Sequence, residues 1–141
     1  MPLNKGLISS KGENVVYSTL EQYSDLVKVI PKINCFDVLH WDTWRNINPT
    51  EHNYLQRTHY DFVVCEPEPP YRFLFAVEYD GIGNNRIYGD GNRYWKLNTK
   101  KRITEKEGCP VIILGPADLP NMVDIIEAEL IKRHKNSGIF G

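Results

Sequence analysis

Two apolar segments joined by a stiff proline turn constrain the fold of this chain more than any other feature. Residues 59–66 and 72–80 have the length and apolar content of β-strands, and the prolines between them cannot continue a ladder. We predict that the segments pair as a hairpin centred on Pro69-Pro70. In this register Asp61 lies directly opposite Glu78, whereas a slip of one residue sends the two side chains to opposite faces.

The predicted opposition of Asp61 and Glu78 indicates a bound cation. Directly opposed side chains in a β-ladder hold their Cβ atoms about 4.5–5.5 Å apart. Two carboxylates at that range repel each other unless a proton or a cation lies between them. Oxygen ligands favour a hard divalent cation such as Mg²⁺. The alternative is a half-exposed hairpin whose face changes from apolar to polar at one end, since surface carboxylates are common.

Composition and charge limit the class of protein. The chain has 141 residues, 41% of them hydrophobic, which predicts one globular domain over residues 1–141. The formal net charge of −1 excludes an overall basic surface, so any nucleic-acid surface must be local. The three cysteines form no CxxC pair, which argues against a zinc ribbon and favours a reducing compartment, the cytoplasm. No stretch has the length and hydrophobicity of a membrane span, so we expect no membrane partner.

The remaining patterns predict an α/β domain. We expect helices over 10–23 and 93–107 and within 116–141, and further strands over 26–33 and 111–114. Residues 34–57 have no clear period beyond a short helical run within 36–44, and 46–53 reads as a polar loop, so the segment is predicted to be an insert or a functional loop. The order of elements predicts a mixed sheet with helices on both faces, with the last strand parallel to a neighbour.

Three features of the chain carry a family resemblance: the order αβββαβ, an Asp in His59-Tyr60-Asp61-Phe62-Val63-Val64, and the motif Glu78-Tyr79-Asp80-Gly81. Together they resemble the restriction-endonuclease-like superfamily, the PD-(D/E)XK nucleases. The chain is similar in particular to a branch of uncharacterised bacterial domains and very-short-patch-repair-like endonucleases, over about residues 10–115. The resemblance implies a restriction-endonuclease-like core and a metal-dependent phosphodiesterase, with DNA as its expected partner.

The resemblance also implies roles for individual acids. Mg²⁺ or Mn²⁺ would be held by Asp61, by Glu78 and by the backbone carbonyl of Tyr79. Asp80 stands where the family carries a lysine, and it is assigned as an auxiliary ligand for a second cation. Glu13 has two interpretations: the third residue of a helical capping box, or an inward-facing acid that completes the metal site.

A positive charge is still required, because a carboxylate cannot stabilise the negative charge that develops on a phosphate under attack. Arg93, Lys96 and Lys100 share one face of the helix predicted over 93–107. Lys100, or else Lys96, is expected to replace the missing lysine, as in versions of the family in which this residue has migrated. The alternative for each of these bases is a solvated helix face.

Four further basic residues are expected to contact phosphates and to make binding sensitive to salt: Arg86, Arg93, Lys101 and Arg102.

The leading hypothesis from the sequence is therefore a Mg²⁺- or Mn²⁺-dependent endonuclease that acts on DNA. One alternative is a nuclease-fold module without catalysis that binds nucleic acid or another protein. A further alternative is a purely structural domain of a larger protein. The sequence leaves open whether the chain acts as a homodimer or inside a larger host protein.

Overall fold

A four-stranded mixed sheet forms the centre of the computed structural model, which describes residues 11–80 and 91–137, with side chains for 11–80 and 94–133. Strands β1 (Lys28–Asn34), β2 (His59–Cys65), β3 (Phe73–Tyr79) and β4 (Val111–Leu114) lie in the order β1-β2-β3-β4. The first two pairings are antiparallel, and β3 pairs with β4 in parallel. The predicted α/β class and the parallel last strand are confirmed.

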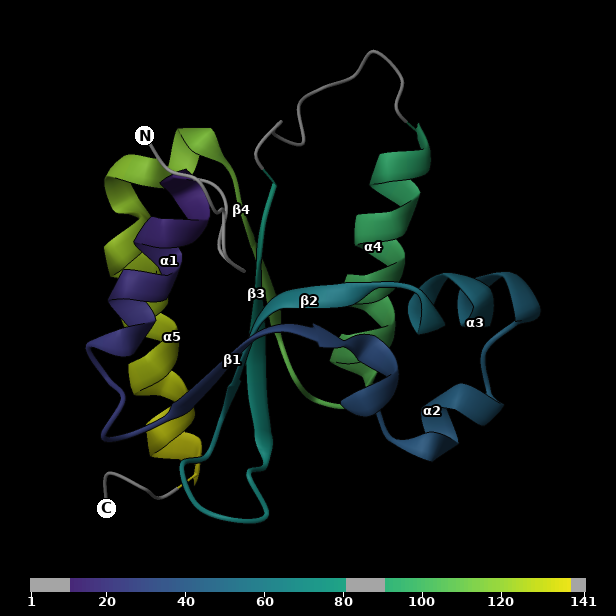
Figure 1. Cartoon of the computed structure of the whole chain (residues 1–141), viewed down its shortest axis with the longest axis horizontal. Coiled ribbons are helices and arrows are strands. Elements are labelled where there is room, and N and C mark those ends of the chain that lie inside the picture. The colour runs from purple at the N-terminus through teal and green to yellow at the C-terminus, as the bar shows by residue number, and fades with distance from the viewer. Residues whose placement is uncertain (1–10, 81–90, 138–141) are drawn as a thin grey trace, which may run out of the picture.

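Helices cover both faces of this sheet (Figure 1). Helices α1 (Lys11–Glu21) and α5 (Met122–Ser137) lie side by side on one face, and α4 (Gly91–Lys106) lies on the other. A short 3-10 helix, η2 (Pro116–Asn121), precedes α5, where the prediction placed the start of the helix itself. The buried side chains form two clusters, which centre on Phe62 for the first and on Val63 for the second. Neighbouring residues of one strand thus supply opposite faces, as the pleat of a strand requires.

The segment 34–57, predicted as an irregular insert, consists largely of short helices. They are η1 (Cys35–Asp37), α2 (Trp41–Arg45) and α3 (Pro49–Gln56). The prediction of a loop over 46–53 was wrong. Asn48 and Glu51 form a capping box, with N···O distances of 2.8 and 3.2 Å, and Pro49 occupies the first helical position. That signal is visible in the sequence.

The hairpin adopts the predicted register from Phe62 to Val64, and the register shifts by one residue at Cys65, which pairs with Phe73. Phe62 pairs with Val77, so the next pair toward the start of β2 is Asp61 with Glu78. Helix α4 ends as predicted, and Gly108 follows it with a left-handed φ of 89°. Across residues 11–80 and 91–137, no helix combines the length and the hydrophobicity that a membrane span requires.

Candidate active site

Asp61 and Glu78 meet where the β2–β3 ladder ends. The N–H of Asp61 donates to Oε2 of Glu78 at 2.9 Å, and the N–H of Tyr79 donates to Oδ2 of Asp61 at 2.8 Å. Each carboxylate therefore accepts a backbone N–H from the opposite strand. Only 8% of Asp61 and 4% of Glu78 are exposed, which excludes the alternative of a half-exposed polar hairpin end.

Lys100 of α4 completes this arrangement. Its Nζ donates to Oε1 of Glu78 at 2.8 Å and to the carbonyl of His59 at 2.7 Å, and the residue is 4% exposed. Lys96 lies one turn earlier on the same helix and is exposed to solvent. The structure thus places Lys100, and not Lys96, beside the acids, and it contradicts the alternative of a solvated face for Lys100.

Burial and charge act in opposite directions on this ion pair. Burial raises the pKa of Glu78, Lys100 lowers it and the charge of Asp61 raises it. The net result is a rise from the ordinary 4.5 to about 7. Burial lowers the pKa of Lys100, but the Glu78 carboxylate more than compensates and raises it overall. Lys100 is therefore an ammonium at neutral pH, while Glu78 titrates near neutrality.

A second lysine, which the sequence did not single out, lies on the other side of Asp61. Nζ of Lys32 is 3.2 Å from Oδ1 of Asp61 and 3.3 Å from both carboxylate oxygens of Glu13. Burial lowers the pKa of Lys32, but the charges of Asp61 and Glu13 and their hydrogen bonds raise it overall. An ammonium therefore bridges the two acids.

The position of Lys32 follows from the β1–β2 ladder. Pro31 pairs with Phe62 and Ile33 with Tyr60, so Lys32 stands opposite Asp61. Its φ of 55° lies in the left-handed region. A lysine between the apolar residues Pro31 and Ile33 of an edge strand was the available signal, but its importance depends on a register that the sequence alone does not fix.

Glu13 reaches the cluster because α1 packs tightly against the end of β3. A Cβ added to Gly12 would lie 2.0 Å from Cζ of Tyr79, so only a glycine permits this approach. Glu13 is buried and contacts Lys32, which supports its interpretation as an inward-facing acid. The capping partner in the other interpretation, Ser10, lies outside the described residues.

Asp80 lies two residues beyond Glu78 and is 2% exposed. Its N–H donates to the carbonyl of Leu114 at 2.7 Å, which extends the contact between β3 and the end of β4. The role of Asp80 as an auxiliary ligand stays a prediction, as does that of the Tyr79 carbonyl.

The predicted phosphate contacts are only partly placed. Nζ of Lys101 lies 2.8 Å from a carboxylate oxygen of Glu105, and Arg102 lies 2.6 Å from a carboxylate oxygen of Glu51. These two basic side chains are therefore paired elsewhere in the molecule and not with the acid cluster. Arg86 and the side chain of Arg93 lie outside the described residues.

Two cations already lie among the acids. In the described part of the chain, no three or more His, Cys, Asp or Glu side chains are arranged to hold a metal ion. The Lys32 ammonium lies between Glu13 and Asp61, and Lys100 lies against Glu78. Two lysine ammonium groups thus offset part of the negative charge of the three acids.

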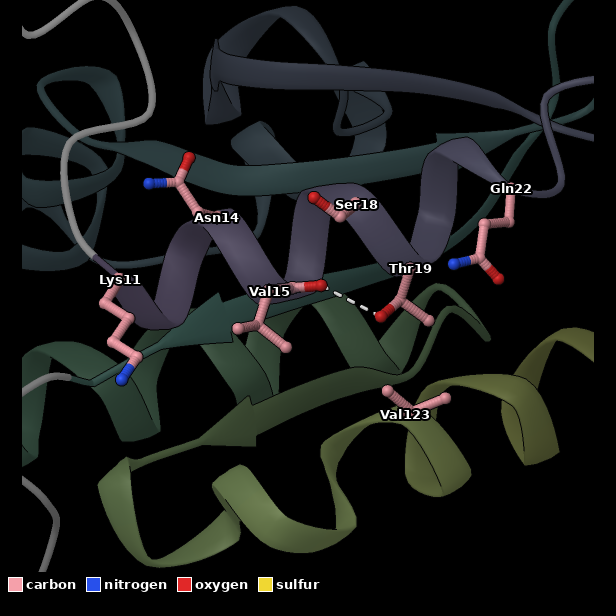
Figure 2. Close-up of a pocket in the computed structure, with 7 residues that line it drawn as sticks. All are labelled: Lys11, Asn14, Val15, Ser18, Thr19, Gln22 and Val123. Carbon is pink, nitrogen blue, oxygen red and sulfur yellow. Dashed lines mark hydrogen bonds between the residues drawn. The ribbon is translucent and has the colours of Figure 1, made fainter.

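A separate groove of about 590 Å³ lies along α1 on the side of α5 (Figure 2). Its lining is mostly polar and uncharged, and comprises Lys11, Asn14, Val15, Ser18, Thr19, Gln22 and Val123. The hydroxyl of Thr19 donates to the carbonyl of Val15 at 2.9 Å, within the helix. The lining contains none of the predicted site residues, and we assign it no chemistry.

Comparison with known proteins places this cluster within a family. A family model described as a protein of unknown function, DUF2726, matches residues 5–130. The chain belongs to the DUF2726 family. The match to DUF2726 spans the acids and both lysines of the cluster. No curated protein and no solved structure matches the chain.

Proposed function

We propose that this DUF2726 domain is a nuclease of the PD-(D/E)XK type, which hydrolyses phosphodiester bonds in DNA with Mg²⁺ or Mn²⁺. One observation carries the proposal: two buried acids at the end of a hairpin exchange hydrogen bonds with the opposite strands, and a buried lysine from the next helix contacts one of them. The α-βββ-α-β order of elements supports the same assignment.

The donors fit a hard divalent cation in their chemistry. Each carboxylate oxygen of Asp61 and Glu78 accepts one hydrogen bond, two of them from backbone N–H groups and two from lysines. A carboxylate oxygen has two lone pairs, so the oxygens that accept a backbone N–H, Oδ2 of Asp61 and Oε2 of Glu78, each retain one for a metal ion. On the other two oxygens a lysine ammonium lies alongside.

The bound metal would neutralise the scissile phosphate and lower the pKa of the attacking water. Asp61 and Glu78 would hold it, with the Tyr79 carbonyl as a further ligand and Glu13 beside Asp61. Lys100 keeps its ammonium fixed between the His59 carbonyl and Glu78, so it needs no reorganisation to face the negative charge that develops on the phosphate. Burial of the cluster strengthens each of these interactions.

A cleavage assay tests the proposal. Purified protein is incubated with supercoiled plasmid, single-stranded DNA and RNA under Mg²⁺ or Mn²⁺, beside Glu78→Gln and Lys100→Met. We expect DNA cleavage by the wild type and a loss of at least about a hundredfold in each variant. Lys106→Met, at an exposed lysine later on the same helix, is the matched control and keeps full activity. The proposal is lost if the wild type cleaves nothing, or if Glu78→Gln cleaves equally well.

A second candidate is a nuclease-fold module that binds nucleic acid without cleaving it. The observation that favours it is the balance of charge in the cluster, where Lys32 and Lys100 already neutralise acids that a catalyst would offer to a metal. Binding of fluorescent DNA in the presence of a chelator separates the two candidates. Salt-dependent binding with no cleavage under either metal supports the module.

A further inference from the structure

Lys32 lies between Glu13 and Asp61, beside the position between Asp61 and Glu78 where a metal ion is expected. Its Nζ lies within 3.3 Å of three carboxylate oxygens, which belong to Glu13 and Asp61. The side chain of Lys32 is 21% exposed, while those of the two acids are 12% exposed each. The lysine therefore covers the acids from the solvent side and has room to leave.

The backbone at Lys32 is built to direct this side chain. A non-glycine residue with a φ of 55° is uncommon, and a long side chain at such a position is less favourable than glycine or asparagine. The residues on either side, Pro31 and Ile33, keep the regular β1–β2 register. The left-handed turn is thus confined to the one residue whose ammonium contacts the acids.

An ammonium and a divalent ion compete for the same oxygen. A Mg²⁺ ion lies about 2.1 Å from a carboxylate oxygen that binds it. Nζ of Lys32 is 3.2 Å from Oδ1 of Asp61, so both cations on this oxygen would face each other at short range in a buried site. Like charges at that range repel strongly when water is excluded. Binding of the metal through this oxygen therefore requires Lys32 to move away.

We propose that Lys32 is a tethered cation that holds Oδ1 of Asp61 in the metal-free domain and is displaced from this oxygen when Mg²⁺ or Mn²⁺ binds. This inference rests on the proposed function of the same acids and concerns its regulation. Lys32 neutralises Glu13 and Asp61 in the absence of metal, and in doing so it weakens metal binding.

Calorimetric titration with Mn²⁺ alone, at fixed ionic strength and near neutral pH, tests this competition. Lys32→Asn removes the charge and keeps a residue that tolerates the left-handed region. We expect it to bind Mn²⁺ at least about tenfold more tightly than the wild type. Lys32→Arg keeps the charge and should bind as weakly as the wild type. Tyr71→Asn is the matched control, because Tyr71 has a φ of 58° but lies in the turn at the other end of the hairpin.

Thermal unfolding provides an independent measurement. Without metal, Lys32→Asn should unfold at a lower temperature than the wild type, because Glu13 and Asp61 then lose the cation between them. Saturating Mn²⁺ should raise the unfolding temperature of Lys32→Asn by more than it raises that of the wild type.

The outcomes separate this inference from the proposed function. Equal Mn²⁺ affinity of the wild type and Lys32→Asn overturns the inference and leaves the metal site intact. Binding by Lys32→Asn alone supports the inference and refutes metal-dependent catalysis by the natural sequence. If neither protein takes up Mn²⁺, both proposals are refuted.

Discussion

Replacement of Lys100 by methionine should destabilise the protein in a way that depends on pH. Glu78 and Lys100 are each 4% exposed and their charged atoms are 2.8 Å apart, so the variant leaves a buried carboxylate without its cation. Breaking a buried ion pair from one side costs about 3–5 kcal/mol when the remaining charge stays ionised. Glu78 can avoid that cost by holding a proton.

The pKa of Glu78 sets the pH range. This pKa is raised from 4.5 to about 7 in the folded protein, so the stability that comes from protonated Glu78 is complete below 4.5 and is lost as the pH rises through 7. Without Lys100 the folded pKa rises further. Below about pH 7 the Glu78 carboxyl is then protonated in both the wild type and Lys100→Met, so the substitution lowers the free energy of unfolding only slightly. Above it, the difference in unfolding free energy should grow by up to about 1.4 kcal/mol per pH unit, and reach about 3 kcal/mol near pH 9.

Urea denaturation from about pH 6 to about pH 9 measures this difference. Lys106→Met is the control: this lysine lies on the exposed side of α4, and its replacement should change stability by less than about 1 kcal/mol at every pH. The double variant Glu78→Gln/Lys100→Met should lose this pH dependence, since the carboxyl that faces position 100 is gone. If Lys100→Met lowers the free energy of unfolding by the same amount at every pH, this reasoning is refuted and the role of Lys100 is one of packing.

Two further substitutions and one labelling experiment test other parts of the fold. Gly12→Ala should destabilise by about 1–3 kcal/mol in urea, because its Cβ would lie 2.0 Å from the Tyr79 ring; a gain of stability, as in an ordinary helix, would contradict this contact. Asn48→Ala should cost about 1 kcal/mol through loss of the α3 cap, and an unchanged urea midpoint would argue against the capping box. Burial raises the pKa of the Cys35 thiol to about 12, so Cys35 should react with a thiol reagent only on unfolding; rapid labelling of Cys35 itself in the native protein at about pH 8 would contradict its burial.

The hairpin was predictable because two apolar segments flank a proline turn. Counting outward from Pro69-Pro70 places Asp61 opposite Glu78, and the ladder has this register from Phe62 to Val64, although it shifts by one residue at Cys65. Lys100 was predicted in another way, from the resemblance to a nuclease family in which the lysine can migrate to the next helix, and Lys96 on the same helix face was its alternative. The structure separates the two, because Lys100 contacts Glu78 and Lys96 is exposed.

Lys32 was not predictable in the same way. Its position opposite Asp61 depends on the β1–β2 register, and the connection between those strands contains three short helices whose lengths the sequence pattern did not fix. The inward position of Glu13 depends likewise on the contact of Gly12 with the Tyr79 ring, and these two residues are far apart in sequence. Helix α3 is different, since the capping box of Asn48 and Glu51 was available and was overlooked because the segment has little hydrophobic periodicity.

The buried charges themselves argue for a function. Three acids and two lysines lie within one cluster, which includes a carboxyl whose pKa is raised to about 7. Networks of this kind contribute little to stability, because apolar side chains of similar volume are usually as good or better. The domain also places a long side chain in the left-handed region at Lys32 and needs a glycine at position 12 to bring Glu13 into place. Stability alone gives no reason for either feature, whereas a site that must exchange one cation for another requires carboxylates that are buried, close together and already neutralised.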